Sequence, residues 1–209
     1  MSLTERLPKA GRMLCATVVL MLGGCGTTPP SHFYLLEPMQ QSRDTPPAGS
    51  GGNALHIGVG PIQFAQYLDR SQIVTSLNES QVRLAETHRW AEPLQHNFAR
   101  VLAENLSILL ATDAISLYPS RNWSDIDYQV PIHVWQFHAD GEGEVTLIAN
   151  WSIRTNQGSD LLTMSKSVLT ARVPPSASYA EITSAMSAVA EMLSREIAEA
   201  LARISHQPA

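Results

Sequence analysis

The sequence predicts an α/β fold in which a mixed, mainly antiparallel sheet carries two long helices. Two amphipathic stretches, residues 92–111 and 178–204, repeat apolar residues in steps of three and four, the spacing of one helix face. Around them lie short segments rich in β-branched residues, several of them joined by turns short enough for hairpins. Because hairpins join antiparallel strands, a purely parallel sheet is excluded.

Residues 1–24 are predicted to be a lipoprotein signal peptide. Three basic residues precede the apolar run Met13–Leu22, which is much shorter than the roughly 20 residues that cross a bilayer. The run ends in Leu22-Gly23-Gly24-Cys25, a small-residue cleavage site followed by cysteine. We therefore expect Cys25 to become the N-terminus and to carry covalent diacylglycerol and an N-acyl chain such as palmitate, since two or more chains give stable attachment. The alternative is an ordinary secretory leader with a chance cysteine.

The residues after Cys25 bear on location. Position 26 is Gly and not the Asp that commonly retains bacterial lipoproteins at the inner membrane, so we expect the periplasmic face of the outer membrane. Residues 25–31 are expected to form a lipid-anchored tether and 32–206 a single domain.

The composition is acidic and leaves few cysteines. The whole chain has a net charge of −5, and the leader removes three basic residues but one acidic residue, so the mature chain is more acidic still. Its overall charge gives no electrostatic footprint for nucleic acid or for anionic lipid headgroups. Cys15 leaves with the leader, so an acylated Cys25 leaves no thiol for a disulfide or a cysteine metal site.

The first strands surround a long loop. His32–Leu36 is apolar and aromatic and is expected to form an edge strand. Residues 38–53 contain Pro-Pro and Gly-rich pieces without apolar periodicity, which predicts a flexible surface loop. Leu55–Gly60 alternates like a strand, and Pro61 is expected to end it.

A first hairpin is expected next, with strands Gln72–Leu77 and Gln81–Ala85. Residues 78–80 are expected to form a three-residue turn in which Asn78 adopts the left-handed conformation.

The first helix is expected over Glu92–Ala111, with Pro93 in its first turn, where a missing N–H costs nothing. Ile115–Tyr118 follows as a short strand. The apolar stripe of the helix comprises Leu94, Phe98, Val101, Leu102, Leu106 and Leu109.

Three long strands follow. Tyr128–His138 and Glu144–Arg154 are expected to form a hairpin around residues 140–143, and Leu161–Val173 to follow a turn at 156–158. Pro174-Pro175 ends the sheet. The last helix begins with a capping box of Ser178 and Glu181 and is expected to reach Ile204. Its apolar face comprises Ile182, Met186, Val189, Leu193, Ile197 and Leu201.

Patterns typical of catalysis or metal binding are weak. His133 and His138 are five apart on an expected strand, which places them on opposite faces unless a bulge intervenes, so a shared metal is disfavoured. The sequence has no Gly-x-Ser-x-Gly elbow, and the Gly-rich Gly58–Pro61 lacks the Gly-Lys-Ser/Thr of a phosphate loop. We therefore expect no enzyme, no metal and no cofactor apart from the lipid on Cys25.

Aromatic residues offer a possible surface. Trp123, Trp135 and Trp151 can form an exposed aromatic patch or pack inside. Trp135 is expected to share a strand face with His133 and Phe137, so that one face of the strand packs on helices and the other is free for a partner.

Two motifs about 16 residues apart are more specific. The first is Tyr67-Leu68-Asp69-Arg70-Ser71-Gln72-Ile73-Val74, and the second is Arg89-Trp90-Ala91-Glu92-Pro93-Leu94, which opens the first helix. Together with the lipobox and Phe33–Leu36, they resemble the ABC-type transport auxiliary lipoproteins over about His32–Ile204.

The resemblance implies a three-layer α/β sandwich similar to anticodon-binding-like domains. It also implies an outer-membrane lipoprotein that works beside an MCE-domain periplasmic protein and an inner-membrane transporter, moves lipid and supports envelope integrity. It brings no catalytic residues. A homo-oligomer is left open.

The motif residues have roles that the chemistry allows. Asp69 and Arg70 are candidates for partner binding or for a local pair, and exposed pairs contribute only about 0–1 kcal/mol. The remaining motif residues are expected to be structural: Tyr67, Leu68, Ile73, Val74, Trp90, Pro93 and Leu94. The first hypothesis is a docking subunit of a lipid transport system; the alternatives are a lipid-carrying module with an acyl chain between helix and sheet, and an envelope hydrolase.

Overall fold

The structure is a computed structural model that describes residues 29–40, 55–120, 125–155 and 160–205. All of its helices and strands belong to one compact unit, Ser31–Ala209. The expected tether before residue 29, most of the 38–53 loop, the 156–158 turn, Trp123 and Cys25 lie outside the described residues.

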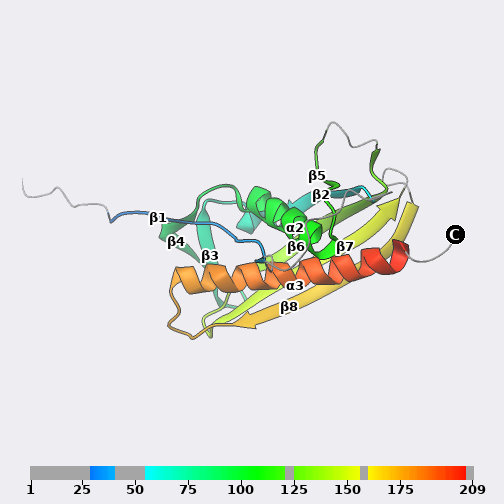
Figure 1. The fold of residues 1–209 in the computed structure, drawn as a ribbon. Helices are drawn as coiled ribbons and strands as arrows, with labels where there is room; N and C mark the ends of the chain where they lie inside the picture. The colour runs from blue at the N-terminus through cyan, green and yellow to red at the C-terminus, as the bar shows by residue number, and fades with distance from the viewer. Residues whose placement is uncertain (1–28, 41–54, 121–124, 156–159, 206–209) are drawn as a thin grey trace, which may run out of the picture. The chain divides into compact units, whose positions relative to one another are not determined.

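The elements follow the expected order of strands, helix, strands and helix (Figure 1). They are β1 (His32–Tyr34), β2 (Ile57–Phe64), the 3₁₀ helix η1 (Gln66–Leu68), β3 (Gln72–Asn78), β4 (Gln81–Trp90), α2 (Leu94–Leu110), β5 (Ile115–Leu117), β6 (Tyr128–Ala139), β7 (Glu144–Thr155), β8 (Asp160–Arg172) and α3 (Tyr179–Ser205).

All eight strands form one open, mixed sheet, which confirms the predicted class. The longest ladders are antiparallel, β6 with β7 and β7 with β8. On its other side β6 pairs in parallel with β2 along its first half and with β3 at its end, where Thr75 lies opposite Ala139. β1 lies at the edge, parallel to the last residues of β4.

Both helices cover the same face of the sheet, so the fold has two layers and not the expected three. α2 packs on β2 and β5, α3 packs on β6, β7 and β8, and the two helices contact each other (Figure 1). Strand β7 shows the consequence: Val145, Leu147, Ala149 and Ile153 are fully buried under the helices, whereas Asn150 on the opposite side is exposed. We call the uncovered side of β6, β7 and β8 the open face.

The helix ends follow from local chemistry. Pro93 directly precedes α2 and makes no side-chain capping bond, and Ala111 ends the helix in the left-handed conformation, with φ 49°. At α3 the capping box is confirmed: the Ser178 N–H donates to Glu181 Oε2 at 2.7 Å, and the Glu181 N–H donates to Ser178 Oγ at 3.3 Å. The pKa of Glu181 is lowered because the Ser178 N–H and the Ser178 hydroxyl both donate to its carboxylate.

Two local expectations were wrong. β2 does not end at Pro61 but continues to Phe64. The ladder with β6 shifts register between Val59 and Ile62, so Pro61, which has no backbone N–H, is not required to donate a ladder hydrogen bond. The β3–β4 turn is shorter than expected, with Asn78 paired to Gln81. The Asn78 Oδ1 accepts the N–H groups of Ser80 and Gln81 at 3.0 Å each, so Asn78 needs no left-handed conformation.

Candidate functional site

The two sequence motifs meet in space where β1 and β4 end, β3 begins and α2 begins. The Trp90 N–H donates to the Ser71 carbonyl at 2.7 Å, which joins the second motif to the first. The Ala91 N–H donates to the Tyr34 carbonyl at 2.9 Å and adds the edge strand. Three segments that are separate in sequence, around Tyr34, Ser71 and Trp90, therefore form one corner of the molecule.

This corner contains a hollow of about 290 Å³, which we call the motif cavity. Three charged residues and the segment that leads into α2, with the buried Trp90, line it: Asp69, Arg70, Ser71, Trp90, Ala91, Glu92 and Pro93. The motif cavity brings together the two residues predicted to bind a partner, Asp69 and Arg70, and two of those predicted to be structural.

Two charged side chains at the motif cavity are held by contacts within the chain. The Arg70 Nε donates to the Tyr67 carbonyl at 2.7 Å, which closes η1, and Glu92 pairs with Arg100 at 2.8 Å. No ion pair joins Asp69 to Arg70 within the described part of the chain. The exposed Asp69 carboxylate and the remaining guanidinium nitrogens of Arg70 are thus able to bind polar groups of another molecule.

Most other motif residues are inside the core. Leu68, Ile73, Val74, Trp90 and Leu94 are each 0–4% exposed. Their burial fixes the backbone from which Asp69 and Arg70 project. Pro93, in contrast, remains exposed at the mouth of the motif cavity.

Tyr67 links the first motif to an irregularity in β6. The β6–β7 ladder shifts register between Val134 and Gln136, which leaves Trp135 as the extra residue of a bulge. The Tyr67 hydroxyl donates to the Trp135 carbonyl at 3.2 Å. Burial raises the pKa of Tyr67, so the hydroxyl keeps its proton at neutral pH.

The bulge overturns the predicted faces of β6. His133 pairs with Asn150 and His138 with Thr146, so both histidines lie on the open face. Phe137 is on the helix side, fully buried, whereas Trp135 is 49% exposed and stacks on His133 with ring centroids 3.9 Å apart. One extra residue between positions 133 and 138 reverses the alternation beyond it.

The two histidines nevertheless lie apart along β6. Three paired positions of the ladder lie between them, and no group of three or more metal-ligating side chains occurs in the described ranges. His138 is buried, burial lowers its pKa, and its Nδ1 has no hydrogen-bond partner among the residues that the structure describes. Trp151, expected as a candidate surface aromatic, is buried and donates its indole N–H to Ser167 at 2.8 Å.

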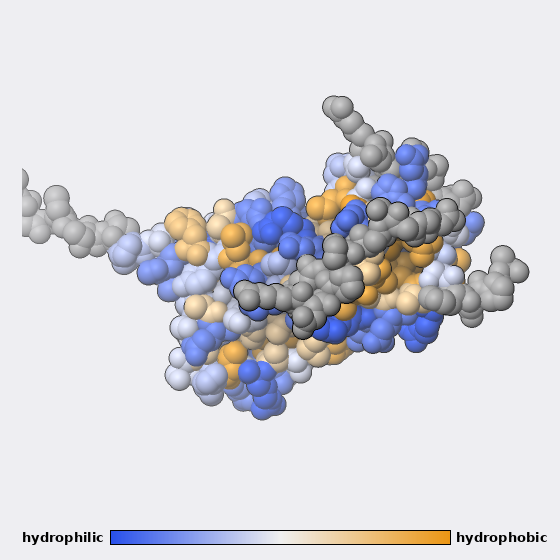
Figure 2. Space-filling model, in the orientation of Figure 1, coloured by the Kyte–Doolittle hydropathy of each residue, from blue (hydrophilic) through white to orange (hydrophobic). Residues whose placement is uncertain are grey.

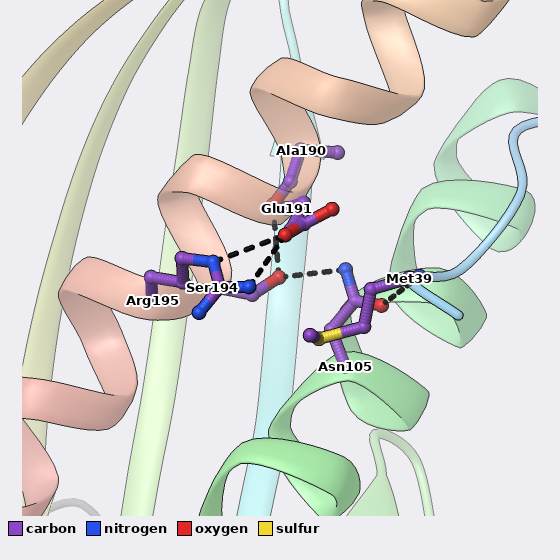
Figure 3. A network of polar contacts seen from close by, with 6 residues as sticks. All are labelled: Met39, Asn105, Ala190, Glu191, Ser194 and Arg195. Atoms are coloured by element: carbon purple, nitrogen blue, oxygen red, sulfur yellow. Dashed lines mark hydrogen bonds and ion pairs between the residues drawn. The ribbon is translucent and has the colours of Figure 1, made fainter. Parts of the chain in front are cut away.

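Sequence reasoning missed two asparagines of α2 that bind the segment after β1; we call them the asparagine clamp. The Asn97 side chain accepts the Leu36 N–H and donates to the Leu36 carbonyl. The Asn105 Oδ1 accepts the Met39 N–H at 2.8 Å, and its Nδ2 donates to Ser194 Oγ of α3 at 3.0 Å (Figure 3). Both asparagines are fully buried.

The sequence of α2 already contained a signal for the asparagine clamp. Asn97 and Asn105 are eight residues apart and lie within the apolar stripe of the helix, on the face expected to be buried. Polar groups on a buried face need partners, and here the partners come from the segment that follows the first strand.

Within the described residues, no helix has the length and hydrophobicity needed to cross a membrane.

Comparison with known proteins agrees with this architecture. The sequence model of the ABC-type transport auxiliary lipoprotein component matches residues 34–198. The chain is 25% identical over 140 residues to the Intermembrane transport lipoprotein PqiC of Escherichia coli strain K12, covering 67% of this chain and 72% of the relative.

Two solved structures share the fold. A crystal structure of an uncharacterized protein superposes with a TM-score of 0.63 at 20% identity, covering 83% of this chain and 99% of that one. A protein from Xanthomonas campestris superposes with a TM-score of 0.64 at 13% identity, covering 80% and 93%.

Proposed function

This chain belongs to the ABC-type transport auxiliary lipoprotein family, and from that premise we propose that it is the outer-membrane docking subunit of an MCE-type lipid transport system. Cys25 holds the domain at the periplasmic face, and the motif cavity receives an MCE-domain protein that reaches from the inner-membrane transporter. The family is an auxiliary transport component and not a class of enzyme, so the proposed role is positional.

One observation carries this proposal: the two motif segments converge on a single exposed corner. Buried residues of both motifs hold the corner rigid, while Asp69 and Arg70 present charges that, in the described part of the chain, no ion pair joins to each other. Stable scaffolds that present a few unsatisfied polar groups are typical of binding surfaces. The name of the Escherichia coli relative, an intermembrane transport lipoprotein, also supports a role in a transport system.

Co-purification tests the proposal. The acylated protein, tagged at its C-terminus, is solubilised gently after mild crosslinking in cells, and bound proteins are identified by mass spectrometry. We expect an MCE-domain protein with the wild type and much less with Cys25→Ser, which lacks the lipid. Recovery of the lipoprotein alone after crosslinking contradicts docking.

Substitutions at the motif cavity then locate the interface. Asp69→Lys and Arg70→Gln should each reduce partner recovery at least fivefold, because a close charge pair at an interface contributes one to several kcal/mol. Glu104→Lys, on an exposed position of α2, is the matched control and should leave recovery unchanged. Equal recovery from all three variants would place the interface elsewhere.

Envelope integrity provides a second readout. Deletion of the gene should sensitise cells to detergent, and the wild-type gene, but not the Asp69→Lys gene, should restore resistance. The lipid-carrying alternative gains no support from the interior, because the side chains between helix and sheet, such as Val189, Leu193 and Ile197, are fully buried in the core.

A further inference from the structure

The open face exposes large apolar side chains among polar ones such as Asn150, although it lies opposite the helix-covered core. Met164 is 73% exposed, Val168 58% and Trp135 49%. Ile148 lies beside Val168 in the β7–β8 ladder, so the apolar side chains continue from one strand to the next. On the side of the helices, Figure 2 shows hydrophobic residues in patches among hydrophilic ones.

The charge of the open face also departs from that of the chain. Between the pairs Thr146–Thr170 and Arg154–Leu161, no β7 or β8 residue on this side is Asp or Glu. Lys166, which is the only lysine after residue 9, lies in the middle of this region opposite Asn150. In a chain of net charge −5, this stretch of the open face therefore carries positive charge and no Asp or Glu, and Glu144, on the same side at the start of β7, pairs with Arg172 at 3.3 Å.

A hollow of about 480 Å³ lies within the open face. His133, Asn150 and Met164 line it, with Arg154 at one end. His133 stacks on Trp135 and so holds the indole beside the hollow. The arrangement combines an amphipathic aromatic, exposed aliphatic side chains and a cationic head on a flexible stem, which are the groups that favour the boundary between phospholipid headgroups and acyl chains.

The length of chain ahead of the domain favours the same occupant. Seven residues, 25–31, separate the predicted lipid anchor from β1 and span at most about 25 Å when fully extended. If Cys25 is acylated, as the proposed function requires, the domain cannot leave the membrane surface by more than that reach. The exposed apolar side chains and Lys166 on the open face of such a domain lie within range of phospholipid.

We propose that the open face is a membrane-contact surface, on which Trp135, Met164 and Val168 enter the headgroup–acyl boundary of a phospholipid bilayer while Lys166 pairs with a lipid phosphate. The predicted lack of an electrostatic footprint for lipid holds for the chain as a whole; this face is an exception to it. This inference rests on the proposed lipid anchor but is independent of the identity of any protein partner.

Vesicle binding tests the surface without the anchor. The mature chain from residue 25, with Cys25→Ser and therefore unacylated, is mixed with vesicles of phosphatidylethanolamine and phosphatidylglycerol (3:1) and separated by flotation. Trp135→Ala and Met164→Ser should each weaken partitioning about tenfold through lost apolar burial. Lys166→Glu should weaken it fivefold or more. Met192→Ser removes an exposed methionine from α3 and is the matched control.

Fluorescence gives a second readout that a folding defect cannot imitate. Vesicles should shift the tryptophan emission of the wild type to the blue, and brominated lipid should quench it, whereas Trp135→Phe should show neither change. These results support a membrane-contact surface. Failure of the wild type to float, or equal flotation of every variant, overturns it, and so does concentration-dependent self-association that the same substitutions abolish. Because partner recovery in cells is scored separately, failure here leaves the docking proposal standing.

Discussion

The asparagine clamp makes a quantitative prediction at Asn105. Asn105→Ala removes a bond from the Met39 N–H and a bond to Ser194, each worth about 1 kcal/mol net. The Met39 N–H then lacks a partner in a half-buried position, which adds up to about 1 kcal/mol, whereas Ser194 still donates to the Ala190 carbonyl at 2.8 Å. We expect the free energy of unfolding to fall by about 2–3 kcal/mol.

Two measurements check this reasoning. Urea unfolding followed by circular dichroism gives the loss of stability, and Glu104→Ala on the exposed side of α2 should change it by less than about 0.5 kcal/mol. Hydrogen exchange gives the location: the Met39 amide should lose protection in Asn105→Ala while amides in the middle of α3 retain theirs at matched stability. A stability loss below 0.5 kcal/mol, or unchanged exchange at Met39, would refute the clamp.

Three further predictions concern the helix cap, a buried histidine and a turn. Ser178→Ala should lower the free energy of unfolding by about 1 kcal/mol in denaturant titration, because it removes one acceptor of the capping box, and Ser178→Thr should not; equal losses would contradict the cap. Burial lowers the pKa of His138, so the unfolded chain takes up the proton first as the pH falls; stability should therefore decline below about pH 6.5, and His138→Gln should flatten that decline, while an unchanged slope would show that other groups cause it. Gly143→Ala should lower the melting temperature sharply, because φ is +85° and a Cβ would lie 2.2 Å from the Val173 carbonyl oxygen; a wild-type melting temperature would mean that the turn adopts another conformation.

The regular elements could be predicted because each depends on local pattern. Apolar spacing and a Ser-x-x-Glu cap suffice to locate α3, and alternation with Gly-rich turns suffices for the β6–β7 hairpin. The layer arrangement could not be predicted in this way. Whether two amphipathic helices share one face of a sheet depends on how the strands are ordered, and periodicity carries no information on strand order.

Irregularities were missed for a related reason. A bulge adds one residue to a strand without a distinctive residue type, so nothing in Val134-Trp135-Gln136 signalled that Phe137 and His138 would exchange faces. The motif cavity was predictable only as two separate segments. Their contact depends on long-range pairing, through which Ser71 and Trp90 become neighbours.

The first strand and the clamp also define how the domain responds to a pull from its proposed anchor. β1 is held by three paired positions at an exposed edge, so tension applied at residue 32 reaches it before any part of the core. Once β1 peels away from β4, the force meets the Leu36–Asn97 contacts, which are buried between the segment and α2. Peeling of β1 thereby frees a few residues and lengthens the tether by roughly 15 Å before the force reaches α2.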